Sequence, residues 1–148
     1  MRHVIYIVFA FLAGVALPVQ GSANAELSRV LDNPVTASLV SGLVGIVFMG
    51  LVIFIFHAPL PNSAVISAPW WAWLGGVMGV AFLIIGTLSI PVIGAANFFV
   101  VVITGQVIAA LIIDKLGLLN VPVHTISSFR VLGVFLVIVG AIIMNLKI

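Results

Sequence analysis

The sequence predicts an all-α integral membrane protein with five transmembrane helices. Of its 148 residues, 64% are hydrophobic and only 5% are charged, whereas a soluble globular domain carries about 25% charged residues. The mean hydropathy is +1.48. The apolar runs are continuous and about twenty residues long, which suits helices that cross the bilayer, whereas barrel strands alternate in polarity and need only about ten residues.

The boundaries of the five helices follow from turn and interface signals. Asp32-Asn33-Pro34 predicts a turn in which Pro34 opens the second helix. The segment 57–69 contains three prolines and predicts a loop outside the hydrocarbon, and the tryptophans of 70–73 predict an interfacial cluster at the start of the third helix. Pro91 predicts a very short connection between the third and fourth helices. One transmembrane domain over 1–148 then contains helices at about 3–30, 35–56, 70–90, 92–113 and 126–146.

The N-terminal segment also imitates a secretory signal. It has Arg2, an apolar core over 4–17 and a small-x-small sequence at Ala23-Asn24-Ala25. Because four further apolar spans follow, the protein stays in the membrane in either case. We therefore expect the segment to be retained as the first transmembrane helix.

The last third of the first helix is polar and contains a proline. A helix that starts at Val4 still has Gln20 inside the hydrocarbon, roughly three-quarters of the way across at about 1.5 Å per residue. Polar side chains at that depth are costly and usually face a partner helix or a water-filled cavity. Pro18 lacks a backbone donor in the same region, and we expect it to break the helix.

Amides and hydroxyls from four helices fall in the same half of the bilayer, away from the face that holds the N-terminus. We interpret them as the lining of a polar vestibule that opens toward that face. The alternative is that they serve only as interhelical hydrogen bonds, worth about 0.6 kcal/mol each. For serines and threonines, the interpretation as interhelical hydrogen bonds is favoured. For the amides, this interpretation and the vestibule lining are equally favoured. The half of the bilayer nearer the N-terminus is apolar except for Thr104 and Gln106. The candidate substrate-binding residues from both halves are Gln20, Asn24, Asn97, Gln106, Ser41 and Thr104.

Small residues form ridges on three helices and predict close helix approach. Gly75 and Gly79 lie on the third helix, four residues apart, and Gly133 and Gly140 lie on the fifth, seven apart. A second ridge on the second helix contains Ser38. The sequence does not show which helix packs against each ridge. Our hypothesis is that Gly133 and Gly140 form a dimer interface.

The sequence contains no nucleophile motif, phosphate-binding glycine loop or HExxH, and it has no cysteine. No carboxylate lies deep in a span, which disfavours proton coupling through a buried acid. His3, His57 and His124 fall on one face by topology, but we expect solvated side chains and no shared metal site. We therefore expect no catalytic residues, no metal and no cofactor. A net charge of +2 gives no reason to expect a nucleic-acid partner.

Positive charges are almost balanced between the two faces of the membrane. Arg2, Lys115 and Arg130 lie on the face of the N-terminus, and Arg29 and Lys147 lie on the other. This weakly favours an N-terminus inside the cell. The balance reflects either scarce charge or insertion in both orientations.

The sequence resembles the small bacterial five-helix branch of the drug/metabolite transporter superfamily, typified by the YdcZ-like inner-membrane proteins. The order and spacing of four stretches carry the resemblance, which covers essentially the whole chain: GVALPVQGSANAEL, PWWAWLGGVMGV, GQVIAALIIDKLGLL and VPVHTISSFRVLGV. It implies a multi-pass protein of the bacterial inner membrane. It also implies an antiparallel homodimer of five plus five inverted helices, in which dual insertion is the favoured reading of the charge balance.

The residues and the resemblance together predict a transporter that works by alternating access across an inverted pair. Amides without deep charge suit a small polar or zwitterionic metabolite. The partners are therefore expected to be a second copy, membrane lipid and a small-molecule substrate. Alternatives are a non-transporting scaffold or accessory subunit and a small dual-topology channel, of which the apolar half of the bundle disfavours the channel. An enzyme is not expected.

Overall fold

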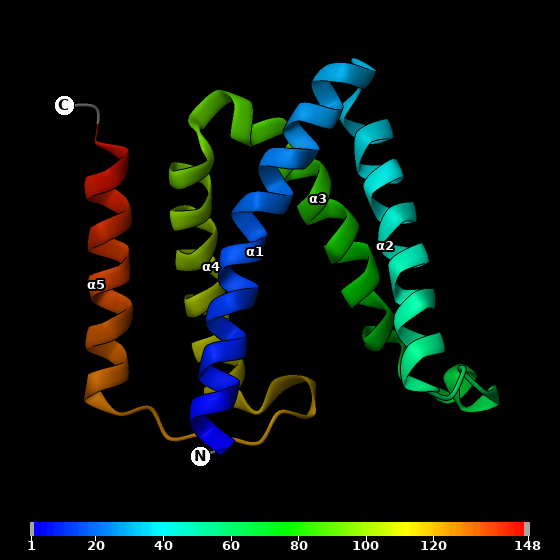
Figure 1. Cartoon of the computed structure of the whole chain (residues 1–148). Coiled ribbons are helices and arrows are strands. Elements are labelled where there is room, and N and C mark those ends of the chain that lie inside the picture. Colours follow the sequence, from blue (N-terminus) through cyan, green and yellow to red (C-terminus); the bar gives the residue numbers. More distant parts are fainter. Residues whose placement is uncertain (1, 147–148) are drawn as a thin grey trace. The chain divides into compact units, whose positions relative to one another are not determined.

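The computed structural model describes residues 2–146 and, within them, the side chains of all but residues 2, 3 and 64. The described residues form helices and turns without strands (Figure 1). Five helices are long and apolar enough to cross a membrane, as predicted. They are α1 (Arg2–Leu31), α2 (Pro34–Phe56), α3 (Leu74–Ile93), α4 (Ala95–Leu116) and α5 (Ser128–Asn145). The chain divides into two compact units, Met1–Val92 and Ile93–Ile148, each described here by itself.

The predicted turn between α1 and α2 is present. Asp32 adopts a left-handed conformation (φ 49°), and Asn33 caps α2 by accepting hydrogen bonds from the backbone N–H groups of Val35 (2.9 Å) and Thr36 (3.0 Å). Pro34 begins α2, where its missing N–H costs nothing because the first helical donors have no partner within the helix. This cap makes α1 and α2 an antiparallel hairpin.

Two hydroxyls connect α2 to α3 in the first unit. The Ser38 and Thr87 oxygens lie 3.5 Å apart, and Thr87 is only 2% exposed. Each hydroxyl also donates to its own helix, Ser38 to the Pro34 carbonyl (2.9 Å) and Thr87 to the Leu83 carbonyl (2.8 Å). The interhelical contact is therefore made between groups that are already satisfied, as expected inside a bilayer.

Two predictions about prolines were wrong. Helix α1 continues through Pro18, so the predicted break is not present. Pro91 lies inside α3 rather than in a connection, and the residue between α3 and α4 is Gly94, with φ 82°. Breaking a helix in lipid leaves several backbone groups without partners, whereas an internal proline leaves few. Glycine is suited to position 94 because it adopts positive φ at low cost.

The second unit is an α4–α5 hairpin. Helix α4 ends at Gly117, which is left-handed (φ 60°) and donates its N–H to the Ile113 carbonyl. The side chain of Ser127 caps α5 by accepting from the Arg130 N–H (3.3 Å). The backbone N–H of His124 in the connecting loop donates to the Asp114 carbonyl (3.0 Å). These bonds fix the loop against the end of α4.

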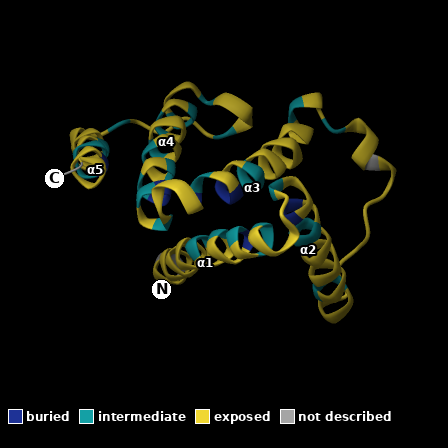
Figure 2. Cartoon of the chain, turned by 90° about the horizontal axis from the view of Figure 1, so that it is seen from above, coloured by how far each residue is buried: buried dark blue, intermediate teal, exposed yellow. Residues whose placement is uncertain are grey.

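Most of the large apolar residues are exposed, and Figure 2 shows exposed residues, in yellow, along all five helices. Buried residues are few and include the small or polar side chains of Asn24, Ala37 and Ser38. Gly75, Gly79, Gly133 and Gly140 have open space where a Cβ would lie, within the part of the chain described. Within the described residues of each unit, no helix therefore approaches these glycines closely.

The geometry at Gly117 gives a stability prediction. A Cβ there would lie 2.8 Å from Val123 Cγ2, and the positive φ would strain any other residue. Gly117→Ala should lower the free energy of unfolding by about 1–2 kcal/mol or more, measured by denaturant titration in detergent micelles. Gly105→Ala in the interior of α4, where nothing lies nearby, is the control and should not destabilise. Equal stability of both variants would contradict this account of the turn.

Candidate functional site

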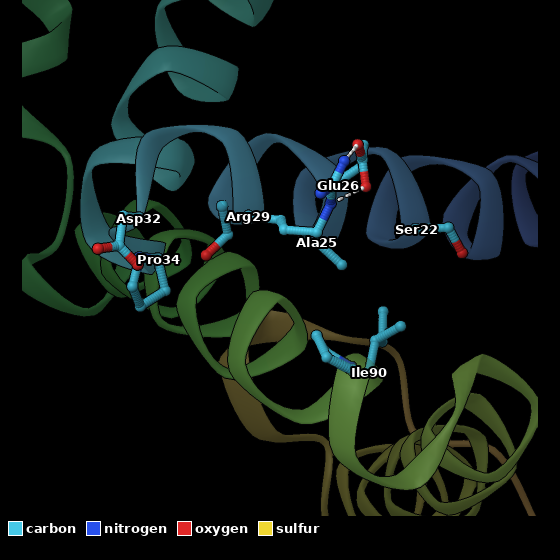
Figure 3. A pocket seen from close by; sticks show the side chains of 9 residues that line it. Ser22, Ala25, Glu26, Arg29, Asp32, Pro34 and Ile90 are labelled. Carbon is cyan, nitrogen blue, oxygen red and sulfur yellow. Dashed lines mark hydrogen bonds and ion pairs between the residues drawn. The ribbon is translucent and has the colours of Figure 1, made fainter.

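The first unit contains an open pocket at the end where α1 meets α2, with a volume of about 480 Å³ (Figure 3). We call it the polar pocket. Helix α1 and its turn supply most of the wall, and the start of α2 and the end of α3 supply the rest. The lining residues are Ser22, Ala25, Glu26, Ser28, Arg29, Asp32, Pro34, Ile90 and Pro91.

Helical periodicity explains why these α1 residues share a wall. Ser22, Glu26 and Arg29 are spaced by four and three residues, so they lie on one face of the helix. Figure 3 shows them along one side of α1, with Ile90 of α3 opposite. Sequence reasoning missed this face because it ranked residues by depth in the bilayer. The spacing of polar residues between 22 and 32 was the signal that could have identified it.

An ion pair defines the electrostatics of the polar pocket. Arg29 donates from Nε to Glu26 Oε2 (2.9 Å) and from Nη2 to Glu26 Oε1 (2.5 Å), which is a bidentate contact. The side chains of Arg29 and Glu26 are 75% and 59% exposed. With Asp32, the wall holds two carboxylates and one guanidinium, and therefore one net negative charge. Such a wall can receive an ammonium group and a carboxylate of the same solute.

Two grooves of the first unit are lined by mostly apolar residues. One groove between α2 and α3, of about 510 Å³, has Ser38 as its one hydroxyl-bearing residue among apolar ones such as Leu39, Leu43 and Val80. A second groove along the first half of α3, from Trp73 to Ile84, is lined only by apolar residues and glycine. Of these three pockets of the first unit, the one at the α1–α2 turn is the one lined by charged side chains.

Three of the predicted site residues lie in this unit, in different environments. Asn24 is buried (5% exposed), Ser41 is half-buried and Gln20 is exposed. No hydrogen bond joins any two of them in residues 2–92. None of the three lines the polar pocket, although Asn24 directly precedes its residue Ala25.

The other three predicted residues belong to α4. Asn97 and Thr104 are half-buried and Gln106 is exposed. The Thr104 hydroxyl donates to the Val100 carbonyl of its own helix (2.8 Å). This bond matches the alternative reading for hydroxyls, in which the helix backbone satisfies them without a cavity.

The two histidines whose side chains are described, His57 and His124, belong to different units. His57 ends α2 in a left-handed conformation (φ 50°), and His124 lies in the loop before α5. The side chain of His3 falls outside the described residues. Among the residues whose placement is described, no group of three or more His, Cys, Asp or Glu side chains could hold a metal ion.

Comparison with known proteins gives one family and one curated relative. The sequence model of the family described as "Putative inner membrane exporter, YdcZ" matches residues 5–143. The Inner membrane protein YdcZ of Escherichia coli (strain K12) is 27% identical over 142 residues, which cover 95% of this chain and 95% of that protein. No solved structure gives a significant match.

The polarity of the pocket predicts where water reaches the first unit. The chain has no cysteine, so Ser22→Cys, Ser28→Cys and Val80→Cys each introduce one thiol. In membranes opened by sonication, a charged thiol reagent should label the two pocket thiols at least about tenfold faster than Cys at the apolar position 80, because the reactive thiolate requires water.

A loop variant, Ser63→Cys, sets the rate for a fully accessible thiol. Equal labelling of the pocket positions and position 80 would show that the polar pocket is dry, and would remove the basis for a solute site there.

Proposed function

Because the chain belongs to the YdcZ family of inner membrane proteins, we propose that it is a small transporter of a polar or zwitterionic metabolite that works by alternating access as an antiparallel homodimer. The chain is a multi-pass protein of the inner membrane. The observation that carries the proposal is the charged lining of the polar pocket beside apolar grooves in the same unit. In this proposal, the open, charged pocket at the α1–α2 turn and the apolar grooves of the same unit form half of a transport pathway.

An inverted second copy supplies the other half. Inverted repeats place a substrate site near the midplane, and alternating access exchanges the side on which it is open. In such a pair, each copy presents its polar pocket to the opposite face of the membrane. The near-balanced positive charge of the two faces, three residues against two, supports insertion in both orientations.

The outer surface of the chain supports a helix partner. Large apolar side chains are exposed on every helix, and Gly75, Gly79, Gly133 and Gly140 leave open space that another helix could approach closely. Gly133 also lines a pocket between α4 and α5, so Gly140 is the better candidate for a dimer contact on α5.

The polar pocket acts in this proposal as the entrance for the solute. Glu26 and Asp32 attract an ammonium group, and Arg29 has donors beyond the two that bind Glu26. Deeper in the bilayer, amides hold the solute without a fixed charge. The proposed contacts there are Gln20, Asn24, Asn97 and Gln106, with Ser41 and Thr104 in supporting positions.

Transport by amide variants tests this role. Gln20→Ala, Asn97→Ala and Gln106→Ala, reconstituted in proteoliposomes and assayed by counterflow with a panel of zwitterionic, cationic and neutral metabolites, should each lower transport by about tenfold, the cost of one lost hydrogen bond to a charged solute. Thr125→Ala in the exposed loop is the control. If all three variants transport normally while the dimer still assembles, the amides do not line the pathway and a scaffold role is favoured.

Fixing the orientation of each copy tests the inverted pair. Asn62→Lys with Ser63→Lys should hold the N-terminus inside, and two lysines appended after Ile148 should hold it outside, because positive segments stay in the cytoplasm. Each form alone should be inactive, and coexpression of both should restore transport. Full activity of either form by itself would contradict an antiparallel dimer.

A further inference from the structure

The α4–α5 hairpin has its own pocket, which the proposed transport function does not use. Its volume is about 350 Å³ and it lies wholly within the second unit. We call it the seam pocket. Helix α4 contributes Val107, Ala110, Leu111 and Asp114, and α5 contributes Arg130, Gly133, Val134 and Val137.

The seam pocket is charged at one end and apolar along the rest. Asp114 and Arg130 lie near the ends of α4 and α5 that join the connecting loop. Val107 and Val137 are each seven residues further along their helices, or about 10 Å at about 1.5 Å per residue. Gly133 keeps the groove open, since nothing lies within 4 Å of the position a Cβ would take. A lipid molecule at the edge of the bilayer has the same distribution of polarity, with a charged head group at one end and apolar acyl chains along the rest.

The ion pair at the charged end of the seam pocket leaves hydrogen-bond donors and acceptors available for a ligand. Arg130 Nη1 lies 3.4 Å from Asp114 Oδ2 in a single contact, and the two side chains are 50% and 31% exposed. The guanidinium carries five N–H donors and the carboxylate about four acceptor sites. Most of this hydrogen-bonding capacity is therefore free for a ligand.

We propose that the seam pocket binds a phospholipid whose head group carries a primary amine, such as phosphatidylethanolamine. Its phosphate binds Arg130, its ammonium binds Asp114, and one acyl chain lies along the apolar wall beside Gly133. Charge complementarity selects this occupant, because the site presents one cation and one anion side by side. Pockets between transmembrane helices recognise lipid head groups in this way.

A second copy of the chain fits the seam pocket less well. In an antiparallel pair, the charged end of one hairpin lies at the opposite membrane face from that of its partner. Asp114 and Arg130 of one copy could then not exchange ion-pair partners with Arg130 and Asp114 of the other. An anionic lipid without an amine would satisfy Arg130 but leave Asp114 facing a phosphate of like charge.

Lipid binding to the full-length protein tests the proposal. The purified protein in detergent is titrated with phosphatidylethanolamine, phosphatidylcholine or phosphatidylglycerol of the same acyl chains, and bound lipid is counted by native mass spectrometry. Phosphatidylethanolamine should bind about three- to tenfold more tightly than phosphatidylcholine, whose quaternary ammonium donates no hydrogen bond. Equal affinity for these two lipids would overturn the proposal.

Single substitutions test each proposed contact with the lipid separately. Asp114→Asn should remove the preference for phosphatidylethanolamine, Arg130→Gln should weaken binding of all three lipids, and Gly133→Leu should block the acyl chain. Lys115→Gln removes a neighbouring cation that does not line the pocket, and it should leave binding unchanged. An equal loss with Lys115→Gln and Arg130→Gln would show only general attraction to charge and overturn the site.

A further outcome concerns the competing occupant. Efficient disulfide formation between Val137→Cys residues of two copies would place a protein partner in the seam pocket, and would also overturn the proposal. Gly133→Ala is a smaller change and should give an intermediate loss of lipid binding. It serves as the control for a folding defect in Gly133→Leu.

Discussion

The hydrocarbon core of a bilayer supplies no hydrogen bonds, and this constraint governs where every polar group of the chain lies. Serine and threonine hydroxyls inside the helices return to their own backbone, as Ser38, Thr87 and Thr104 do. Charged side chains lie near helix ends, and two ion pairs form there, Glu26 with Arg29 and Asp114 with Arg130. We therefore propose that the few polar groups that the backbone does not satisfy mark the places where water or a ligand enters.

Much of the fold could be predicted from sequence because each span is a long uninterrupted apolar run. The turn at Asp32-Asn33-Pro34 was also readable, since the capping residue and the proline act locally. Pro18 and Pro91 were misread because their effect depends on the surroundings. In lipid the helix persists across a proline, since ending it would leave more backbone groups without partners.

The candidate site could be predicted only in part, because the sequence does not fix the direction of each side chain around its helix. Depth along a helix follows from counting residues, but the direction of a side chain around the helix follows from its neighbours. Gln20 has the depth expected of a pathway residue and is exposed, whereas Asn24 is buried. Glu26, Arg29 and Asp32 were assigned to the membrane edge or to the turn, and their common pocket emerged only when α1 was placed against α2 and α3. The arrangement of a second copy cannot be read from one chain.

The central claim is that two copies in opposite orientation enclose a water-filled path that the polar pocket enters. Electron cryomicroscopy of the full chain in lipid nanodiscs, with a bound antibody fragment to mark the direction of each copy, tests it most directly. The account predicts an antiparallel pair whose amide side chains face a hydrated cavity that opens to one side. Two copies in the same direction, or a dry interior with those amides turned toward lipid, would contradict it.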